Sequence, residues 1–308
     1  MSHLNKKTLF LHLIVLFLGA KALSVEISRE RTQYFWQPLK GLGALTLSAG
    51  ALETNYLTEI TGGDTSTYLL IPTYSVIYAF GLTQNWSFGL NLSTSPTEMT
   101  TTAADGTVLD SSTGGPNNLA VSFKNTTPFS KWNLHYGLTL SLSFDVNQPT
   151  QAGAQGNNFS GGDGLTPYAG TSYNIFGKSF IGFKGEYFYQ QPRTVDPNRG
   201  ITGARQKYGG NEVVASAFFE WHQYPWLIDF SGSYIWADTE ETTLTTTQTT
   251  TSPFTTQTQN LGIEFFFNHQ IMARLVASLT EVSQIAGSLG TIDARMESGG
   301  TFILRDEF

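Results

Sequence analysis

Apolar and polar residues alternate with a period of two along most of the chain. The pattern is clearest over 134–146, where Leu, Tyr, Phe and Val at the even positions alternate with mostly small or polar residues at the odd positions. It recurs over 86–93 and 226–236. Side chains of a β-strand point alternately to its two faces, so this period indicates strands with one apolar and one polar face. The chain is therefore predicted to be all-β.

Twelve runs of this kind define the predicted strands. They cover residues 42–54, 67–80, 86–95, 118–126, 133–146, 165–176, 179–190, 211–222, 226–238, 259–267, 271–281 and 293–308. The first run is the least regular, so any count from ten to fourteen strands fits the pattern.

The connections between these runs alternate in length. Those after the even-numbered runs are short, at 81–85, 127–132, 176–178, 223–225 and 268–270. Those after the odd-numbered runs are mostly long, at 96–117, 147–164, 191–210 and 239–258, with shorter ones at 55–66 and 282–292. Tight turns on one side and long loops on the other are typical of transmembrane antiparallel β-barrels. Residues 41–308 are therefore expected to form such a barrel, with both termini on the short-turn side.

Composition indicates which face of the strands meets lipid. Charged residues make up 13% of the chain, about half of the ~25% usual in soluble proteins, and aromatic residues also make up 13%. The apolar set is rich in bulky aromatics, and the other set is mostly Gly, Ser, Thr and Asn. In a transmembrane barrel the first set faces hydrocarbon and the second lines the lumen. The alternative is a secreted sandwich or lipocalin-like barrel, whose apolar face would line a core.

The N-terminus predicts export. Lys6 and Lys7 precede an apolar run, 8–18, which is followed by the small-x-small site Ala20-Lys21-Ala22. This is typical of a cleaved signal peptide over 1–22. As a helix the run would reach only ~16 Å, too short to span a bilayer. The barrel is therefore expected in the outer membrane, with lipid around it.

The mature chain is expected to be acidic and to lack thiol chemistry. Removing residues 1–22 takes away three of the 17 Lys and Arg, and the 14 that remain against 24 Asp and Glu give a formal charge of −10. Nucleic-acid binding needs clustered Lys and Arg, so nucleic acid is not expected as a partner. The sequence has no Cys, which excludes disulfides and thiolate metal sites. Residues 23–40, which contain Tyr34-Phe35-Trp36, form either a plug inside the barrel or a periplasmic segment.

The end of the chain resembles a known signal. Phe302, Leu304 and Phe308 stand at alternate positions, which resembles the C-terminal signature that the barrel-assembly machinery recognises in Gram-negative outer-membrane proteins; Asp306 departs from it, since an apolar residue is usual there. The hairpin over 78–90 resembles the repeated strand–turn–strand sequence pattern of such barrels. It is similar in particular to the outer-membrane transporters of the meta-pathway phenol-degradation family. This resemblance implies passage of aromatic or otherwise hydrophobic compounds.

Strand parity directs most charged side chains of the runs into the lumen, where rings of charge set the selectivity of a pore. The candidates for this role are Lys124, His135, Lys184, Glu186, Glu220, Asp229, Glu264, Arg274, Arg295 and Glu297, and Asp145 and His222 share their parity. The other lumen positions are chiefly small residues. A three-residue loop over 268–270 would place Glu264 opposite Arg274, as part of a constriction or as a structural salt bridge.

These features together favour a channel for passive passage of small solutes. The alternative is a structural or surface-recognition barrel with a plugged lumen, in which the Thr-rich stretch 242–258 contacts partners. A hydrolase is less favoured, because a serine hydrolase needs a Ser beside a His, and none is evident beside His135 or His222. One Glu and one His, Glu220 and His222, are too few to hold a metal, so neither metal nor cofactor is predicted.

Overall fold

The computed structural model describes residues 32–59, 63–113, 119–142, 163–191, 193–195, 205–243, 248–268, 270–287 and 290–308. The predicted signal peptide, 1–22, lies outside these residues, as does the predicted lumen residue Asp145. Within the described residues, no helix is long and apolar enough to cross a membrane.

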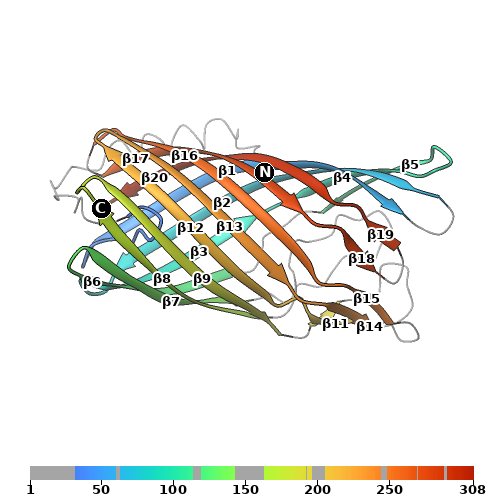
Figure 1. Cartoon of the computed structure of the whole chain (residues 1–308), viewed down its shortest axis with the longest axis horizontal. Coiled ribbons are helices and arrows are strands. Elements are labelled where there is room, and N and C mark those ends of the chain that lie inside the picture. Colours follow the sequence, from blue (N-terminus) through green and yellow to red (C-terminus); the bar gives the residue numbers. More distant parts are fainter. Residues whose placement is uncertain are drawn as a thin grey trace, which may run out of the picture.

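Twelve long strands of the described chain form a closed antiparallel barrel. They are β1 (Gly43–Glu59), β2 (Thr65–Gly81), β3 (Trp86–Thr94), β6 (Leu119–Phe129), β7 (Trp132–Leu142), β8 (Gly164–Ile175), β9 (Ser179–Gln190), β12 (Glu212–Gln223), β13 (Trp226–Ala237), β16 (Phe254–Phe266), β17 (Ile271–Val282) and β20 (Arg295–Glu307). Each pairs with the next in this order, and β20 pairs with β1. The strands run obliquely around the barrel (Figure 1). The predicted fold class and count of twelve are confirmed.

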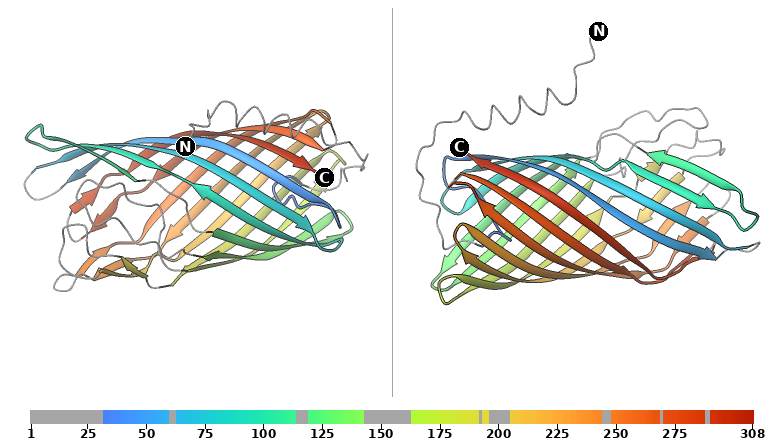
Figure 2. Two further views of the ribbon diagram at one scale, coloured as in Figure 1. Left: turned by 180° about the vertical axis from the view of Figure 1, so that it is seen from behind. Right: turned by 90° about the horizontal axis from the view of Figure 1, so that it is seen from above.

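The predicted short turns are confirmed. Between β8 and β9, for example, only residues 176–178 intervene, and Phe176 and Gly177 both have positive φ angles, 55° and 71°. Glycine adopts this left-handed backbone without steric cost, which permits the tight reversal. The C-terminus lies at this end of the barrel, called here the turn side (Figure 2).

On the opposite side the sheet continues into the predicted long connections. Shorter strands extend it there: β4 (Thr97–Thr102), β5 (Val108–Thr113), β10 (Arg193–Val195), β11 (Arg205–Gly209), β14 (Glu240–Thr243), β15 (Gln248–Thr251), β18 (Ile285–Gly287) and β19 (Gly290–Ile292). They pair with one another and with the ends of β1 and β2. The prediction of loops throughout these connections was therefore wrong in part.

The Thr-rich stretch shows the reason for this error. The polar composition of 242–258 predicts a solvated loop, but Gln248–Thr251 forms β15 and β16 begins at Phe254. Thr is β-branched and favours extended backbone, so a polar composition did not prevent strand formation here.

The outer face of the barrel is apolar and aromatic. Outward side chains such as Phe183, Phe230 and Leu261 are about half exposed in the isolated chain, while their sequence neighbours point inward. Trp86, Trp132, Trp221 and Trp226 all lie at turn-side strand ends. An apolar band edged by aromatic rings is the surface that a transmembrane barrel presents to lipid.

The lumen is fuller than the sequence analysis expected. Small residues such as Ser172 and Ser231 do point inward, but so do Phe180, Phe218 and Leu227, all of which are buried. Phe180 and Phe218 pack with Phe35 into a small hydrophobic core inside the barrel. The expectation of a lumen lined chiefly by small residues is therefore wrong at the turn side, where large rings fill the space.

Replacing the outward Leu261 by Arg is expected to destabilise the inserted barrel by ~2–4 kcal/mol, because the charged group would lie in hydrocarbon. Ser278 points into the lumen and pairs with Asn260, next to Leu261, so Ser278→Arg is the matched control and should cost much less. Urea unfolding in lipid vesicles, followed by heat-modifiable gel migration, measures both. Equal destabilisation would contradict this assignment of faces.

Candidate functional site

The segment before β1 enters the lumen from the turn side. Tyr34 stacks on Phe218 of β12, with ring centroids 4.3 Å apart, and Phe35 stacks on His135 of β7 at 3.9 Å. The segment passes close to Gly81, where a Cβ atom would collide with the Leu39 carbonyl, and then joins β1. Figures 1 and 2 show this segment, at the blue start of the described chain, within the outline of the barrel beside the C-terminal end.

Glu220 on β12 anchors this segment. Its carboxylate accepts hydrogen bonds from the Thr32 hydroxyl at 2.6 Å, the Gln33 backbone N–H at 2.9 Å and the Tyr34 backbone N–H at 2.5 Å. His222 Nε2 lies 3.0 Å from the same carboxylate. Glu220 is only 1% exposed, and hydrogen bonds to a buried carboxylate are among the stronger ones in proteins. This residue, predicted as a lumen charge, therefore holds backbone in place.

Two further strands hold the segment. Gln37 accepts a hydrogen bond from the Ser87 hydroxyl of β3 at 3.1 Å and donates one to the Asn85 carbonyl. Arg305 of β20 donates to the Gln33 side-chain oxygen at 2.7 Å and lies 4.0 Å from the Trp36 ring centroid. The segment is thus tied to separate sectors of the barrel wall. Arg305 was not among the predicted lumen residues, although it has the lumen parity of Arg295 and Glu297.

The predicted Glu264–Arg274 ion pair is replaced by two others. The register does place these residues opposite each other, but Arg274 pairs with Asp229 at 2.7 Å, and the Arg305 guanidinium lies 3.6 Å from Glu264. Asp229 lies opposite Gly262 on β16, and its carboxylate occupies the space where a Cβ of that glycine would stand. Because Gly262 has no side chain, Arg274 can reach across β16 to Asp229 and does not pair with Glu264.

His135 has a serine beside it, contrary to the sequence analysis. Its Nε2 lies 2.9 Å from Ser172 Oγ, and its Nδ1 lies 2.9 Å from Thr126 Oγ1. The two strands bring together residues 37 apart in the chain, which alternation alone could not show. Ser172 is fully buried and the Phe35 ring covers the imidazole. The pair therefore contributes to packing inside the barrel.

A second group of predicted lumen charges lies farther from the turn side. Lys184 and Glu186 of β9 form a salt bridge of 2.7 Å, and the Lys184 ammonium lies 5.0 Å from the Tyr168 ring and 6.0 Å from the Tyr34 ring. Lys124 of β6 interacts electrostatically with both of these charges. Burial raises the pKa of the Tyr34 phenol above its ordinary value, so this hydroxyl, which hydrogen-bonds Ser216, stays neutral at physiological pH.

The remaining predicted lumen charges lie apart from this group. Arg295 and Glu297 form their own pair at 2.8 Å near the start of β20, and the Arg295 guanidinium lies over Tyr56. Within the described part of the chain, no three His, Cys, Asp or Glu side chains form a cluster that could hold a metal.

The C-terminal residues complete the barrel. Phe308 exchanges two backbone hydrogen bonds with Gly43 of β1, and its side chain, like that of Phe302, points outward and is half exposed. Leu304 shares this outward parity and is partly buried, whereas Asp306 is buried. The role of Phe302, Leu304 and Phe308 as an assembly signal stays a prediction.

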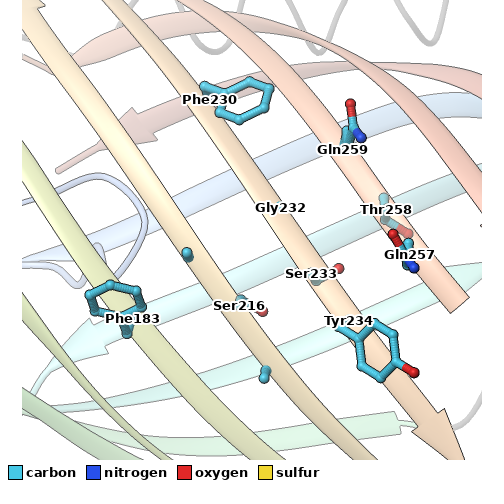
Figure 3. A pocket seen from close by; sticks show the side chains of 11 residues that line it. Phe183, Ser216, Phe230, Gly232, Ser233, Tyr234, Gln257, Thr258 and Gln259 are labelled. Carbon is cyan, nitrogen blue, oxygen red and sulfur yellow. The ribbon is translucent and has the colours of Figure 1, made fainter. Parts of the chain in front are cut away.

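Among the described residues, a hollow of about 460 Å³ lies between β9, β12, β13 and β16. Figure 3 shows Phe183, Phe230, Tyr234, Gln257 and Gln259 around it, with Gly232 at its centre. Ala215 and Ala217 also line it. These side chains have outward parity, whereas Ser216, Ser233 and Thr258, which also line the hollow, have lumen parity.

Comparison with known proteins supports the fold. No family model and no curated protein matches the chain. The structure of the COG4313 outer membrane channel from Pseudomonas putida F1 is similar over 92% of this chain and 100% of that one, with 10% identity and a TM-score of 0.58. A deletion mutant of TodX, a monoaromatic hydrocarbon channel, is similar over 89% and 92% of the two chains, with 9% identity and a TM-score of 0.52. The chain therefore has the fold of outer-membrane β-barrels.

Replacing Glu220 by Ala is expected to release the segment from the wall. Each hydrogen bond to a charged group contributes ~1.5–3 kcal/mol, so amide exchange over residues 32–40 should become more than tenfold faster. Hydrogen-exchange mass spectrometry of the refolded barrel measures this rate. Glu297→Ala removes a lumen carboxylate near the long-loop end of β20, away from the segment, and should leave this exchange rate unchanged. The same exchange rate in Glu220→Ala and the unaltered chain would contradict the anchoring role.

Proposed function

We propose that this protein is an outer-membrane channel through which small solutes pass by diffusion, and that residues 32–40 narrow its lumen from the turn side. The observation that carries the proposal is the pairing of an apolar outer wall with a lumen of polar and charged side chains. Eight strands make a barrel just filled by side chains, and sixteen to eighteen leave a wide water channel. A barrel of twelve strands that holds a folded segment fits a narrow path.

The solutes are proposed to include aromatic or hydrophobic compounds. Tyr34, Phe35, Tyr168 and Phe218 place ring faces and edges in the lumen, and such surfaces favour flat apolar solutes. The structural neighbours support this choice, because TodX is named as a monoaromatic hydrocarbon channel. The resemblance to the meta-pathway phenol-degradation family points the same way.

The proposal includes the route by which the barrel reaches its membrane. Residues 1–22 direct export, and the outward apolar residues at the end of β20 present the chain to the barrel-assembly machinery. Lipid then surrounds the aromatic outer wall.

A plugged barrel with a structural or recognition role is the second candidate, since the rings of the segment and of β9 and β12 fill the turn-side lumen. In that case the Thr-rich stretch 242–258 would contact partners, and residues 32–40 would stay in place and close the lumen.

The double variant Tyr34→Gly/Phe35→Gly separates these candidates. Removing two rings widens the turn-side lumen, so single-channel conductance in planar bilayers should rise several-fold over that of the unaltered protein. A matched control is Tyr136→Gly/Phe123→Gly, which removes two rings from the outer wall and should leave conductance unchanged. Heat-modifiable migration verifies that every variant is folded. No conductance in either the unaltered or the widened barrel would contradict a channel and support the plugged one.

A further inference from the structure

One lysine of the lumen, Lys124, forms no salt bridge with any residue that the structure describes. Lys184 is neutralised by Glu186 at 2.7 Å. Lys124, which faces them, makes no ion pair or hydrogen bond with any described residue, and it is partly buried on β6. Removing a charge from water without a close partner is costly, so an anion from solution that paired with Lys124 would relieve this cost.

The wall beside Lys124 offers a flat aromatic surface. Lys124 lies opposite Gly137 on β7, and the Tyr168 ring of β8 covers Gly137, where a Cβ atom would collide with it. The ammonium of Lys184 lies on the same ring at 5.0 Å. The backbone register therefore brings Lys124, Tyr168 and Lys184 together across four adjacent strands, without a side chain at position 137 between them.

The segment in the lumen forms the floor of this arrangement. The Phe35 ring lies nearly parallel to Tyr168, with centroids 6.4 Å apart, and Tyr34 stands close enough to Lys184 for a cation–π contact. The Tyr34 hydroxyl is held by Ser216. The rings of Tyr168, Tyr34 and Phe35 and the ammonium of Lys184 therefore lie together in the lumen.

We propose that Lys124, Tyr168 and Lys184 form a binding site for small aromatic monoanions, with the carboxylate at Lys124 and the ring against Tyr168. This inference rests on the proposed channel and names its solute class. Two lysines and one glutamate leave a net charge of +1, which matches one carboxylate better than a phosphate dianion. The rings add affinity that an inorganic anion or a sugar cannot gain.

Benzoate is the probe for this site, and equilibrium dialysis against the full barrel in detergent measures its binding directly. Lys124→Met should weaken binding about tenfold, the effect of ~1.4 kcal/mol lost with one charge contact. Lys124→Arg should keep most of it, and Glu186→Gln should strengthen it by raising the local positive charge. Lys178→Met is the matched control, because Lys178 lies exposed in a turn and its ammonium donates a hydrogen bond to Gln223, away from this site.

Benzyl alcohol and inorganic phosphate test the two halves of the site. Both should bind more weakly than benzoate, the alcohol because it lacks the charge and phosphate because it lacks the ring. Binding of phosphate equal to that of benzoate would overturn the aromatic part of the proposal. Binding of benzoate that is unchanged in folded Lys124→Met would overturn the site itself.

Conductance distinguishes failure of this site from failure of the proposed function. If the barrel is a channel, benzoate on the long-loop side should reduce current, and Lys124→Met should need about tenfold more for the same reduction. Specific binding in dialysis without conductance would contradict the channel and keep the site. Conductance without specific binding would keep the channel and contradict the site.

Discussion

Closure of the backbone ladder is the constraint on which the rest of this structure depends. In hydrocarbon no water can pair with free N–H and C=O groups, so a sheet is stable there only if its last strand pairs with its first. In this chain β20 pairs with β1 from Glu307 opposite Ala44 to Glu297 opposite Thr54, and Phe308 adds two more hydrogen bonds to Gly43. Because the barrel closes, every strand has one face toward lipid and one toward the interior. Alternate side chains therefore lie in these two environments.

Charged side chains in the barrel interior lie away from bulk water and need partners there. At the turn side the chain itself supplies them, since Glu220 accepts the hydrogen bonds of Thr32, Gln33 and Tyr34, and Arg305 reaches Gln33. Farther along the lumen the charges pair within strands, Lys184 with Glu186 on β9 and Arg295 with Glu297 on β20, whereas Lys124 forms no salt bridge with a described residue. The same side chains that fix residues 32–40 therefore also set the width and the charge of any path through the barrel.

Much of the fold could be predicted from the sequence, because a period of two is a local property. The run 179–190 was placed at its true bounds, and the tight turns fell where Gly, Asn and Pro interrupt the pattern. Strand formation in the Thr-rich stretch was missed, because polarity was given more weight there than the β-branched shape of Thr.

The site was harder to predict, because its contacts depend on register, side-chain reach and the path of a segment with no alternation. Parity named Glu220 as a lumen residue, but it could not show that backbone from residues 33 and 34 would reach it. Nor could it show that Gly262 lets Arg274 pass Glu264 and reach Asp229, or that Ser172 lies beside His135. A barrel with the same alternation along its strands but a different register between them would form different side-chain pairs.

The two faces of each strand should be in different solvents, lipid outside and water inside. Because the sequence has no Cys, single cysteines can be placed along β13 from Leu227 to Tyr234 and spin-labelled without ambiguity. In lipid vesicles, labels at the even positions should collide mainly with dissolved oxygen and labels at the odd positions with a water-soluble nickel complex, so accessibility should alternate along the strand. Uniform accessibility, or greater nickel accessibility at Ile228 and Phe230, would contradict the account.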